Sequence, residues 1–175
     1  MEVYIDDMIT KSVYASDHWG HLRDTFNILR KHQMRLNPEK CAFGVTSGKF
    51  LGFMVQQRGI EANPDKIRTV LGMKSPSTIK EVQSLAGRIA ALSRFISKAT
   101  DRCKPFFKAL KAGKKFQWTA ECEEAFQKLK EYLVNSPLLA KPKPREVLLL
   151  YFTVSEHATS NVLLREDADW VQRPI

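Results

Sequence analysis

The sequence has few cysteines and no long apolar run. Its three cysteines are an odd number, lie far apart and include no Cys-x-x-Cys pair, which predicts reduced thiols in an intracellular protein. No stretch approaches the ~18 consecutive apolar residues of a membrane span. The N-terminus begins with acidic residues where a secretory signal carries basic ones. We therefore expect neither a membrane span nor a secretory signal.

Acidic residues are also scarce, above all in the middle of the chain. Across all 175 residues, 28 Lys and Arg face 19 Asp and Glu, a net charge of +9. Residues 66–115 hold thirteen of the basic residues but only two acids, Glu81 and Asp101, so this basic segment carries +11 and the remainder −2. Release of counterions from a phosphate backbone is the usual use of such a concentration of charge. We therefore expect a nucleic-acid surface there.

The first sixty residues predict hairpins around one helix. Apolar residues flank Asp6 and Asp7, the pattern of a tight hairpin with two carboxylates at its tip. Apolar spacing predicts a helix that follows Ser16-Asp17 and ends before Asn37-Pro38. Two short strands, 41–43 and 50–55, are expected on either side of a turn at Ser47-Gly48.

The remainder predicts helices and then strands. Asn63-Pro64 has the order of an N-cap and a first-turn proline, and Thr78 with Glu81 forms a capping-box pattern that begins an apolar stripe running to Ile96. A basic helix ending near Gly113 and a helix capped by Thr119 follow, then a proline-containing linker and two strands at 147–152 and 161–164. The fold class expected is α+β.

Paired carboxylates at a hairpin tip have a definite chemical use. Mg²⁺ binds through one or two carboxylates and completes its shell with water and phosphate oxygens, and a two-metal site stabilises the attacking and leaving oxygens of phosphoryl transfer. Asp6 and Asp7 are therefore candidate Mg²⁺ ligands. For an isolated pair, ordinary turn preference is the alternative explanation.

The surrounding residues match a known order of motifs. Tyr4-Ile5-Asp6-Asp7 resembles the Tyr-x-Asp-Asp box of reverse transcriptases. It is followed by Leu36-Asn37-Pro38-Glu39-Lys40-Cys41-Ala42-Phe43, Phe50-Leu51-Gly52-Phe53, Asn63-Pro64-Asp65-Lys66, Phe95-Ile96 and Phe116-Gln117-Trp118-Thr119. This succession, over essentially the whole chain, is similar to the Pol polyprotein of gypsy-type LTR retrotransposons, and more to the plant members than the animal ones.

The resemblance implies a division of the chain and a set of site residues. Residues 1–62 match the C-terminal part of the palm, 63–115 the thumb, 116–145 the connection, and 146–175 the beginning of the RNase H-like domain. It implies Asp6 and Asp7 as catalytic Mg²⁺ ligands, and an RNA/DNA template-primer as partner. The nucleic-acid contacts expected from it are Tyr4, Phe53, Lys66, Arg88, Arg94, Lys98, Lys108 and Lys111.

Two departures from the family pattern limit the expected activity. The third palm carboxylate and the fingers of such polymerases precede the Tyr-x-Asp-Asp box, where this sequence has only three residues, so we expect binding of a dNTP only if those parts are supplied. The first strand of an active RNase H domain carries an Asp where this chain has Thr153, and a hydroxyl does not replace a carboxylate as an Mg²⁺ ligand. The other carboxylates of that site would lie beyond Ile175. The isolated chain is therefore expected to lack both activities.

Other functional classes stay open. The main alternative, suggested by the basic segment, is a non-catalytic module that binds duplex through phosphate contacts without reading sequence, and a pseudogene product is a third possibility. His18 and His21 have a metal-chelating spacing, although surface histidines are the simpler explanation. Trp118 and the Phe106-Phe107 pair are expected in the core. Within the cell, a cytoplasmic or nuclear retroelement particle is the expected location.

Overall fold

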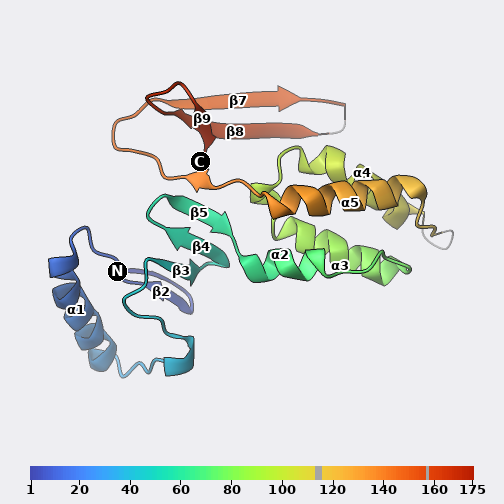
Figure 1. The fold of residues 1–175 in the computed structure, drawn as a ribbon. Helices are drawn as coiled ribbons and strands as arrows, with labels where there is room; N and C mark the ends of the chain where they lie inside the picture. Colours follow the sequence, from blue (N-terminus) through green and yellow to red (C-terminus); the bar gives the residue numbers. More distant parts are fainter. Residues whose placement is uncertain (113–115, 157) are drawn as a thin grey trace. The chain divides into compact units, whose positions relative to one another are not determined.

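A computed structural model of the chain describes residues 1–112, 116–156 and 158–175, and shows an α+β fold (Figure 1). Gly113, expected to end a helix, and the basic Lys114 and Lys115 lie outside the described residues. The chain divides into two compact units, residues 1–55 and 56–175. Each unit is described by itself below.

The first unit begins with the acidic hairpin. Strands β1 (Glu2–Tyr4) and β2 (Asp7–Ile9) pair antiparallel, with Tyr4 opposite Asp7. The 3-10 turn η1 (Ala15–Asp17) leads into α1 (His18–Lys31), whose buried residues are Thr25 and Leu29. The Thr10 and Thr25 hydroxyls lie 3.2 Å apart and connect the chain after β2 to this helix.

The second hairpin of this unit differs from the sequence expectation. Residues 41–43 form no strand. After η2 (Pro38–Lys40), the strands are β3 (Ser47–Phe50) and β4 (Phe53–Gln56), and the turn between them is Leu51-Gly52 rather than Ser47-Gly48. Leu51 and Gly52 both have positive φ, 53° and 76°, as two-residue hairpin loops require. The apolar run 50–55 predicted one strand because apolar periodicity does not reveal a turn inside it.

The second unit uses part of the expected linker as a strand. Strand β6 (Leu139–Ala140) pairs antiparallel with β5 (Gly59–Ala62), and both of its residues are buried. Gly59 has φ 150°, and a Cβ there would lie 1.9 Å from the Leu139 carbonyl oxygen. Glycine at this position therefore permits the close approach of the two strands.

Four helices form the centre of the second unit: α2 (Pro64–Leu71), α3 (Ile79–Ala90), α4 (Ala99–Lys111) and α5 (Ala120–Val134). The predicted caps are confirmed: the Asn63, Thr78 and Thr119 side chains accept from the first-turn amides of α2, α3 and α5. The apolar stripe expected to run to Ile96 is interrupted, because α3 ends at Ala90 and a separate 3-10 turn, η3 (Ser93–Phe95), follows.

The capping box of α3 predicts a pH dependence of stability. The Ser77 N–H, which donates to Glu81 at 2.6 Å, and then the Ser77 hydroxyl hold the pKa of the Glu81 carboxyl below its ordinary 4.5. This stabilisation is present above the unfolded pKa and is lost as pH falls through the lower folded pKa. We expect Glu81→Gln to lower the thermal midpoint at pH 7, with the difference from wild type vanishing well below pH 4.5. A difference independent of pH would contradict the assignment.

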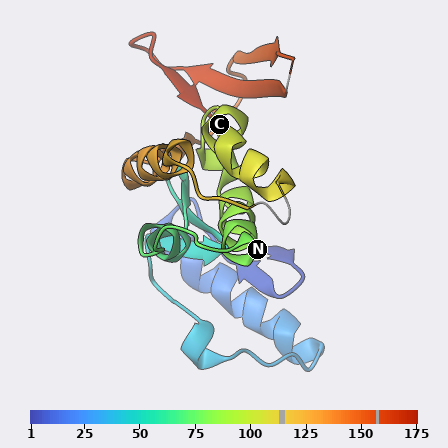
Figure 2. The same cartoon turned by 90° about the vertical axis from the view of Figure 1, so that its right-hand side faces the viewer.

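The core of the second unit lies among α2, α3, α4 and α5, and α4 and α5 are packed against each other (Figures 1 and 2). Phe106 and Phe126 are fully buried, and the half-buried Trp118 ring lies between them, stacked on Phe106 at 5.7 Å and edge-on to Phe126 at 6.0 Å. The core role predicted for Trp118 and Phe106 is confirmed. That predicted for Phe107 is wrong: its side chain is 44% exposed, because the next residue of a helix points about 100° away.

A three-stranded sheet ends the second unit: β7 (Leu148–Val154), β8 (Thr159–Glu166) and β9 (Gln172–Pro174), in that order. The Glu146 carboxylate before β7 accepts from Nε of the buried Arg165, at 2.9 Å and 3.1 Å. Much of β7 is nevertheless exposed, including Leu150 and Phe152.

Candidate nucleic-acid interface and acidic hairpin

The two candidate metal ligands lie at different places in the first hairpin. Asp6 is in the turn, after Ile5 with φ 53°, while Asp7 is the first residue of β2. Both aspartates and the neighbouring Tyr4 are exposed. The side chains are therefore accessible to a cation or a large ligand.

Asp7 also contacts the second hairpin of the same unit. Its Oδ2 accepts a hydrogen bond from the Leu51 N–H at 2.9 Å. Leu51 has the left-handed conformation, which costs a residue with a Cβ about 1–2 kcal/mol. A hydrogen bond to a charged acceptor is worth about as much. The carboxylate of Asp7 thus supports a backbone conformation that leucine disfavours.

The two carboxylates of the hairpin, those of Asp6 and Asp7, are the type of ligand that Mg²⁺ binds. This ion takes one or two protein carboxylates and obtains its remaining ligands from water and phosphate. Asp7 can still offer acceptor sites, since a carboxylate has about four lone-pair positions and the Leu51 amide uses one. Among the described residues, no group of three or more His, Cys, Asp or Glu converges as a metal site. A cation at the hairpin would therefore need phosphate or further ligands.

A groove lies between α2 and α3 of the second unit. It has a volume of about 350 Å³ and brings together two of the predicted contact residues, Lys66 and Arg88, and its lining also includes Gly87. A Cβ added to Gly87 would meet nothing within 4 Å. The groove is lined by Lys66, Thr69, Ser84, Gly87, Arg88 and Ala91.

The cation of Arg88 is held at the edge of this groove. Its guanidinium donates at 3.4 Å to the Ser84 hydroxyl and at 3.4 Å to the Thr69 carbonyl. These bonds are long and satisfy only part of its five N–H donors. The rest remain available for a phosphate oxygen. Sequence reasoning missed the two hydroxyl-bearing residues, because their place in the groove depends on how α2 packs against α3.

The other predicted cations of the second unit lie outside this groove. Lys98 precedes α4 with φ 52°, Arg94 is exposed in η3, and Lys111 is exposed in the last turn of α4. Lys108 is partly neutralised by Glu121, at 3.5 Å. The basic segment is thus spread over several surfaces. Phe53, a predicted contact of the first unit, begins β4 and is half-buried.

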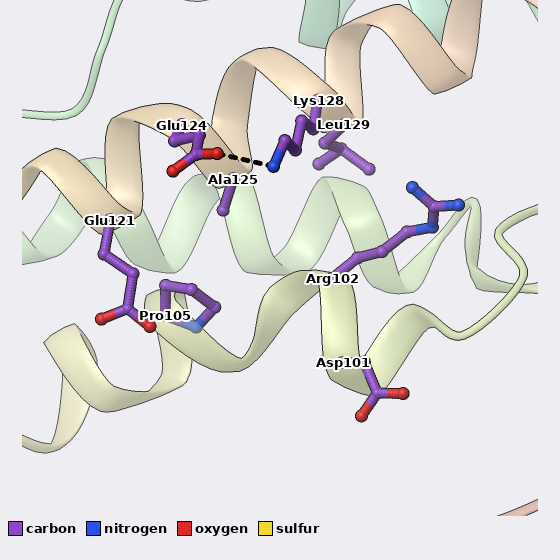
Figure 3. A pocket seen from close by; sticks show the side chains of 8 residues that line it. All are labelled: Asp101, Arg102, Pro105, Glu121, Glu124, Ala125, Lys128 and Leu129. Carbon is purple, nitrogen blue, oxygen red and sulfur yellow. Dashed lines mark hydrogen bonds and ion pairs between the residues drawn. The ribbon is translucent and has the colours of Figure 1, made fainter.

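A second hollow, between α4 and α5, carries mixed charge (Figure 3). Its volume is about 220 Å³. Lys128 pairs with Glu124 at 2.6 Å, and Arg102 lies over the Tyr132 ring at 4.3 Å while its Nε donates to the Ser97 carbonyl. Because its two cations are engaged within the protein, this hollow is a poor phosphate site. Its lining comprises Asp101, Arg102, Pro105, Glu121, Glu124, Ala125, Lys128 and Leu129.

Two family models match the chain, one at each end. Residues 1–55 match the model described as reverse transcriptase (RNA-dependent DNA polymerase), and residues 118–175 match the RNase H-like domain found in reverse transcriptase. The chain is thus similar to reverse transcriptase at one end and to the RNase H-like domain of reverse transcriptases at the other. The resemblance inferred from the Tyr4–Asp7 box and the motifs after it is confirmed at this level.

Curated relatives of the chain include transposon polyproteins. The Tf2-3 polyprotein of Schizosaccharomyces pombe is 28% identical over 172 residues, and the Tf2-7 polyprotein is 27% identical. Each alignment covers 98% of this chain and 13% of the polyprotein, so the segment spans about an eighth of the length of these relatives.

Solved structures confirm the α+β fold of the segment. The foamy viral protease-reverse transcriptase in complex with an RNA/DNA hybrid matches with a TM-score of 0.84 and 22% identity, over 99% of this chain and 24% of that chain. A form in complex with double-stranded DNA matches with a TM-score of 0.83, at 22% identity, over 99% and 31%.

In the RNase H-like part, Thr153 lies on β7, opposite Ser160 of β8, and is exposed. The position expected to carry an Asp in active domains thus presents a neutral hydroxyl. No helix in the described part of the chain is long and apolar enough to cross a membrane.

Proposed function

We propose that this segment grips a template–primer duplex as part of a retrotransposon reverse transcriptase, with the α2–α3 groove in contact with the sugar-phosphate backbone. The observation that carries the proposal is the open position of Gly87 in the groove that Lys66 and Arg88 also line. Glycine inside a helix costs about 1 kcal/mol relative to alanine. None of the described residues fills that space, so a ligand that approaches the helix backbone closely explains it.

The side chains of the groove suit a nucleic acid that is bound through its phosphate backbone, independently of its base sequence. Lys66 and Arg88 supply positive charge, and the hydroxyls of Thr69 and Ser84 supply hydrogen bonds of the kind that phosphate oxygens accept. The groove belongs to the +11 segment found in the sequence. That the structurally similar foamy viral enzyme was solved in complex with double-stranded DNA and with an RNA/DNA hybrid supports the same class of ligand.

Asp6 and Asp7 are proposed as Mg²⁺ ligands and catalytic residues of the polymerase reaction. When bound, the ion supplies positive charge that stabilises phosphoryl transfer. The protein's own contribution is to present two exposed carboxylates on a short hairpin, one in its turn and one on β2. Tyr4, opposite Asp7, and Phe53, at the start of β4, are proposed to contact the nucleic acid there.

We also propose that residues 1–62 are the C-terminal part of the palm, 63–115 the thumb, 116–145 the connection and 146–175 the beginning of the RNase H-like domain. The same proposal places the chain among the gypsy-type elements, close to the plant ones, and in a retroelement particle. The matched transposon polyproteins support a retrotransposon origin. Thr153 supports an RNase H-like domain that does not cleave, because the hydroxyl lacks the charge of a carboxylate ligand.

Salt dependence of binding tests the proposed groove. Affinity for an RNA–DNA hybrid, measured by fluorescence anisotropy from 50 to 300 mM KCl, is expected to fall steeply. The double substitution Lys66→Gln with Arg88→Gln should reduce the slope of log K against log salt by about 1.8, roughly 0.9 for each phosphate that is no longer neutralised.

The matched control is Lys128→Gln, which removes a cation paired with Glu124 in the mixed-charge hollow. It should leave the slope unchanged. An unchanged slope in the Lys66 and Arg88 variant, or an equal change in the control, would contradict the proposed interface.

A non-catalytic, sequence-independent binding module is the second candidate, favoured by the basic segment alone. It predicts the same salt dependence but no role for the hairpin carboxylates. Primer extension by a longer polyprotein that contains this segment separates the two candidates. Loss of extension in Asp6→Asn supports catalysis, while full extension supports the binding module.

A further inference from the structure

One hydrogen bond connects the acidic hairpin to the second hairpin of the first unit. The Leu51 N–H donates to Oδ2 of Asp7 at 2.9 Å, across 44 residues of sequence. Strand β2, which begins with Asp7, also packs beside β3, which ends just before Leu51. The contact therefore joins the start of one strand to the turn that follows its neighbour.

The first residue of the Leu51-Gly52 turn is a leucine, a residue type that disfavours the left-handed conformation found there. Two-residue hairpin loops with positive φ at both positions favour Asn-Gly or Asp-Gly, whose first residue tolerates the left-handed region. Here a leucine has φ 53°, and its side chain is 39% exposed, so packing gives it little support. A strained residue of this kind persists when its surroundings hold it in place, and such strain is frequent at functional sites.

The Leu51 N–H, which donates to Asp7, is not used by the hydrogen bond that closes the β3–β4 turn. In a β-turn the bond runs from the carbonyl of the first residue to the N–H of the fourth, so the N–H of the second residue points away. At the β3–β4 turn this second residue is Leu51. The carboxylate of Asp7 gives its N–H a charged acceptor, which makes a stronger bond than a neutral one.

We propose that Asp7 is also a positioning residue, which holds the β3–β4 turn against the acidic hairpin in the conformation that contacts the nucleic acid. This inference rests on the proposed function and adds a second role for one of the two aspartates. Both carboxylates serve the cation, but Asp7 alone also orders the protein, whether or not a cation is bound. One carboxylate oxygen of Asp7 is committed to Leu51, and its remaining lone pairs stay available.

Amide hydrogen exchange of the 175-residue chain, followed by NMR without metal or nucleic acid, tests the positioning role directly. Asp7→Ala is expected to speed exchange of the Leu51 amide about tenfold, because the acceptor is lost. Asp7→Asn keeps an acceptor oxygen and should retain most of the protection. Asp6→Ala, the adjacent carboxylate, should leave exchange at Leu51 unchanged, and the Leu29 amide in α1 reports whether the first unit is folded.

Binding in EDTA tests whether the turn matters for the nucleic acid. Asp7→Ala and Asp7→Asn remove the same charge, so any difference between them reports the acceptor alone. We expect hybrid affinity to be about threefold to tenfold weaker in Asp7→Ala than in Asp7→Asn. If the wild-type chain binds no hybrid, the proposed function fails, while the exchange measurement still decides whether Asp7 holds the turn.

Relief of the strain provides the last test, and it applies even if Asp7→Ala alone unfolds the first unit. Leu51→Gly permits positive φ without a Cβ, so Asp7→Ala should cost less in that background, both in exchange protection of the Gly52 amide and in hybrid affinity. Equal effects of Asp7→Ala in both backgrounds would overturn the proposal. Leu51 exchange that is unaffected by Asp7→Ala, or equally affected by Asp6→Ala, would also overturn it.

Discussion

Replacing Gly87 by leucine is expected to stabilise the free protein and to weaken its binding of an RNA–DNA hybrid at least tenfold. The stabilisation follows from helix propensity, by up to about 1 kcal/mol, because a side chain at this position meets open space. The loss of affinity follows because the same side chain occupies the groove between Lys66 and Arg88. Urea unfolding and fluorescence anisotropy measure the two effects separately.

Gly20 provides a matched control for this experiment. It also lies inside a helix, α1, and a Cβ there would meet nothing within 4 Å. Gly20→Leu should therefore stabilise the protein without loss of affinity. A gain in stability together with a loss of affinity in Gly87→Leu would show that position 87 faces the ligand and has no structural need for glycine. Binding by Gly87→Leu as tight as by wild type would contradict the proposed contact.

Replacing Phe126 by alanine is expected to destabilise the second unit by about 3–5 kcal/mol, the cost of a large cavity in a packed core. The ring is fully buried, edge-on to Trp118, with the Lys130 ammonium 4.4 Å from its centre. Small domains are stable by only about 5–15 kcal/mol, so this change removes much of the total. Urea unfolding followed by tryptophan fluorescence measures it.

Phe107→Ala is the control for the core substitution, since it removes the same ring from an exposed position of α4. Its effect is expected to stay within about 0.5 kcal/mol, as for most surface changes. If the two substitutions destabilised the protein equally, the assignment of Phe126 to the core and of Phe107 to the surface would be wrong. A large loss of hybrid affinity in Phe107→Ala alone would instead place this ring at the nucleic acid.

The features that sequence reasoning predicted correctly depend on short-range interactions. The caps at Asn63, Thr78 and Thr119 are made within the first turn of their own helices, so the local order of residues determines them. The same is true of the hairpin around Asp6 and Asp7, although its two-residue turn is Ile5-Asp6 rather than the expected Asp6-Asp7, and Asp7 begins β2. The similarity to reverse transcriptases was also predicted, because its motifs are contiguous stretches of sequence.

The features that it missed depend on which distant segment lies beside a residue. Proline content predicted a linker around Leu139, but pairing with β5 buries that residue in a sheet. The apolar run 50–55 gave no sign of the turn at Leu51, whose conformation involves a carboxylate 44 residues away. Both depend on pairings whose closure costs chain entropy and whose partners no local pattern names.

The sequence by itself determined the similarity of this chain to reverse transcriptases, its concentration of positive charge and the positions of its helix caps, because each is encoded by residues close together along the chain. The tertiary structure decided which of these residues lie together. Packing of α2 against α3 places Gly87 in one groove with two cations, and the approach of β3 to β2 brings the Leu51 amide to Asp7. The physical reason is that a groove or a shared hydrogen bond exists only once separate elements are packed, whereas charge and local hydrogen bonds are already set by neighbouring residues.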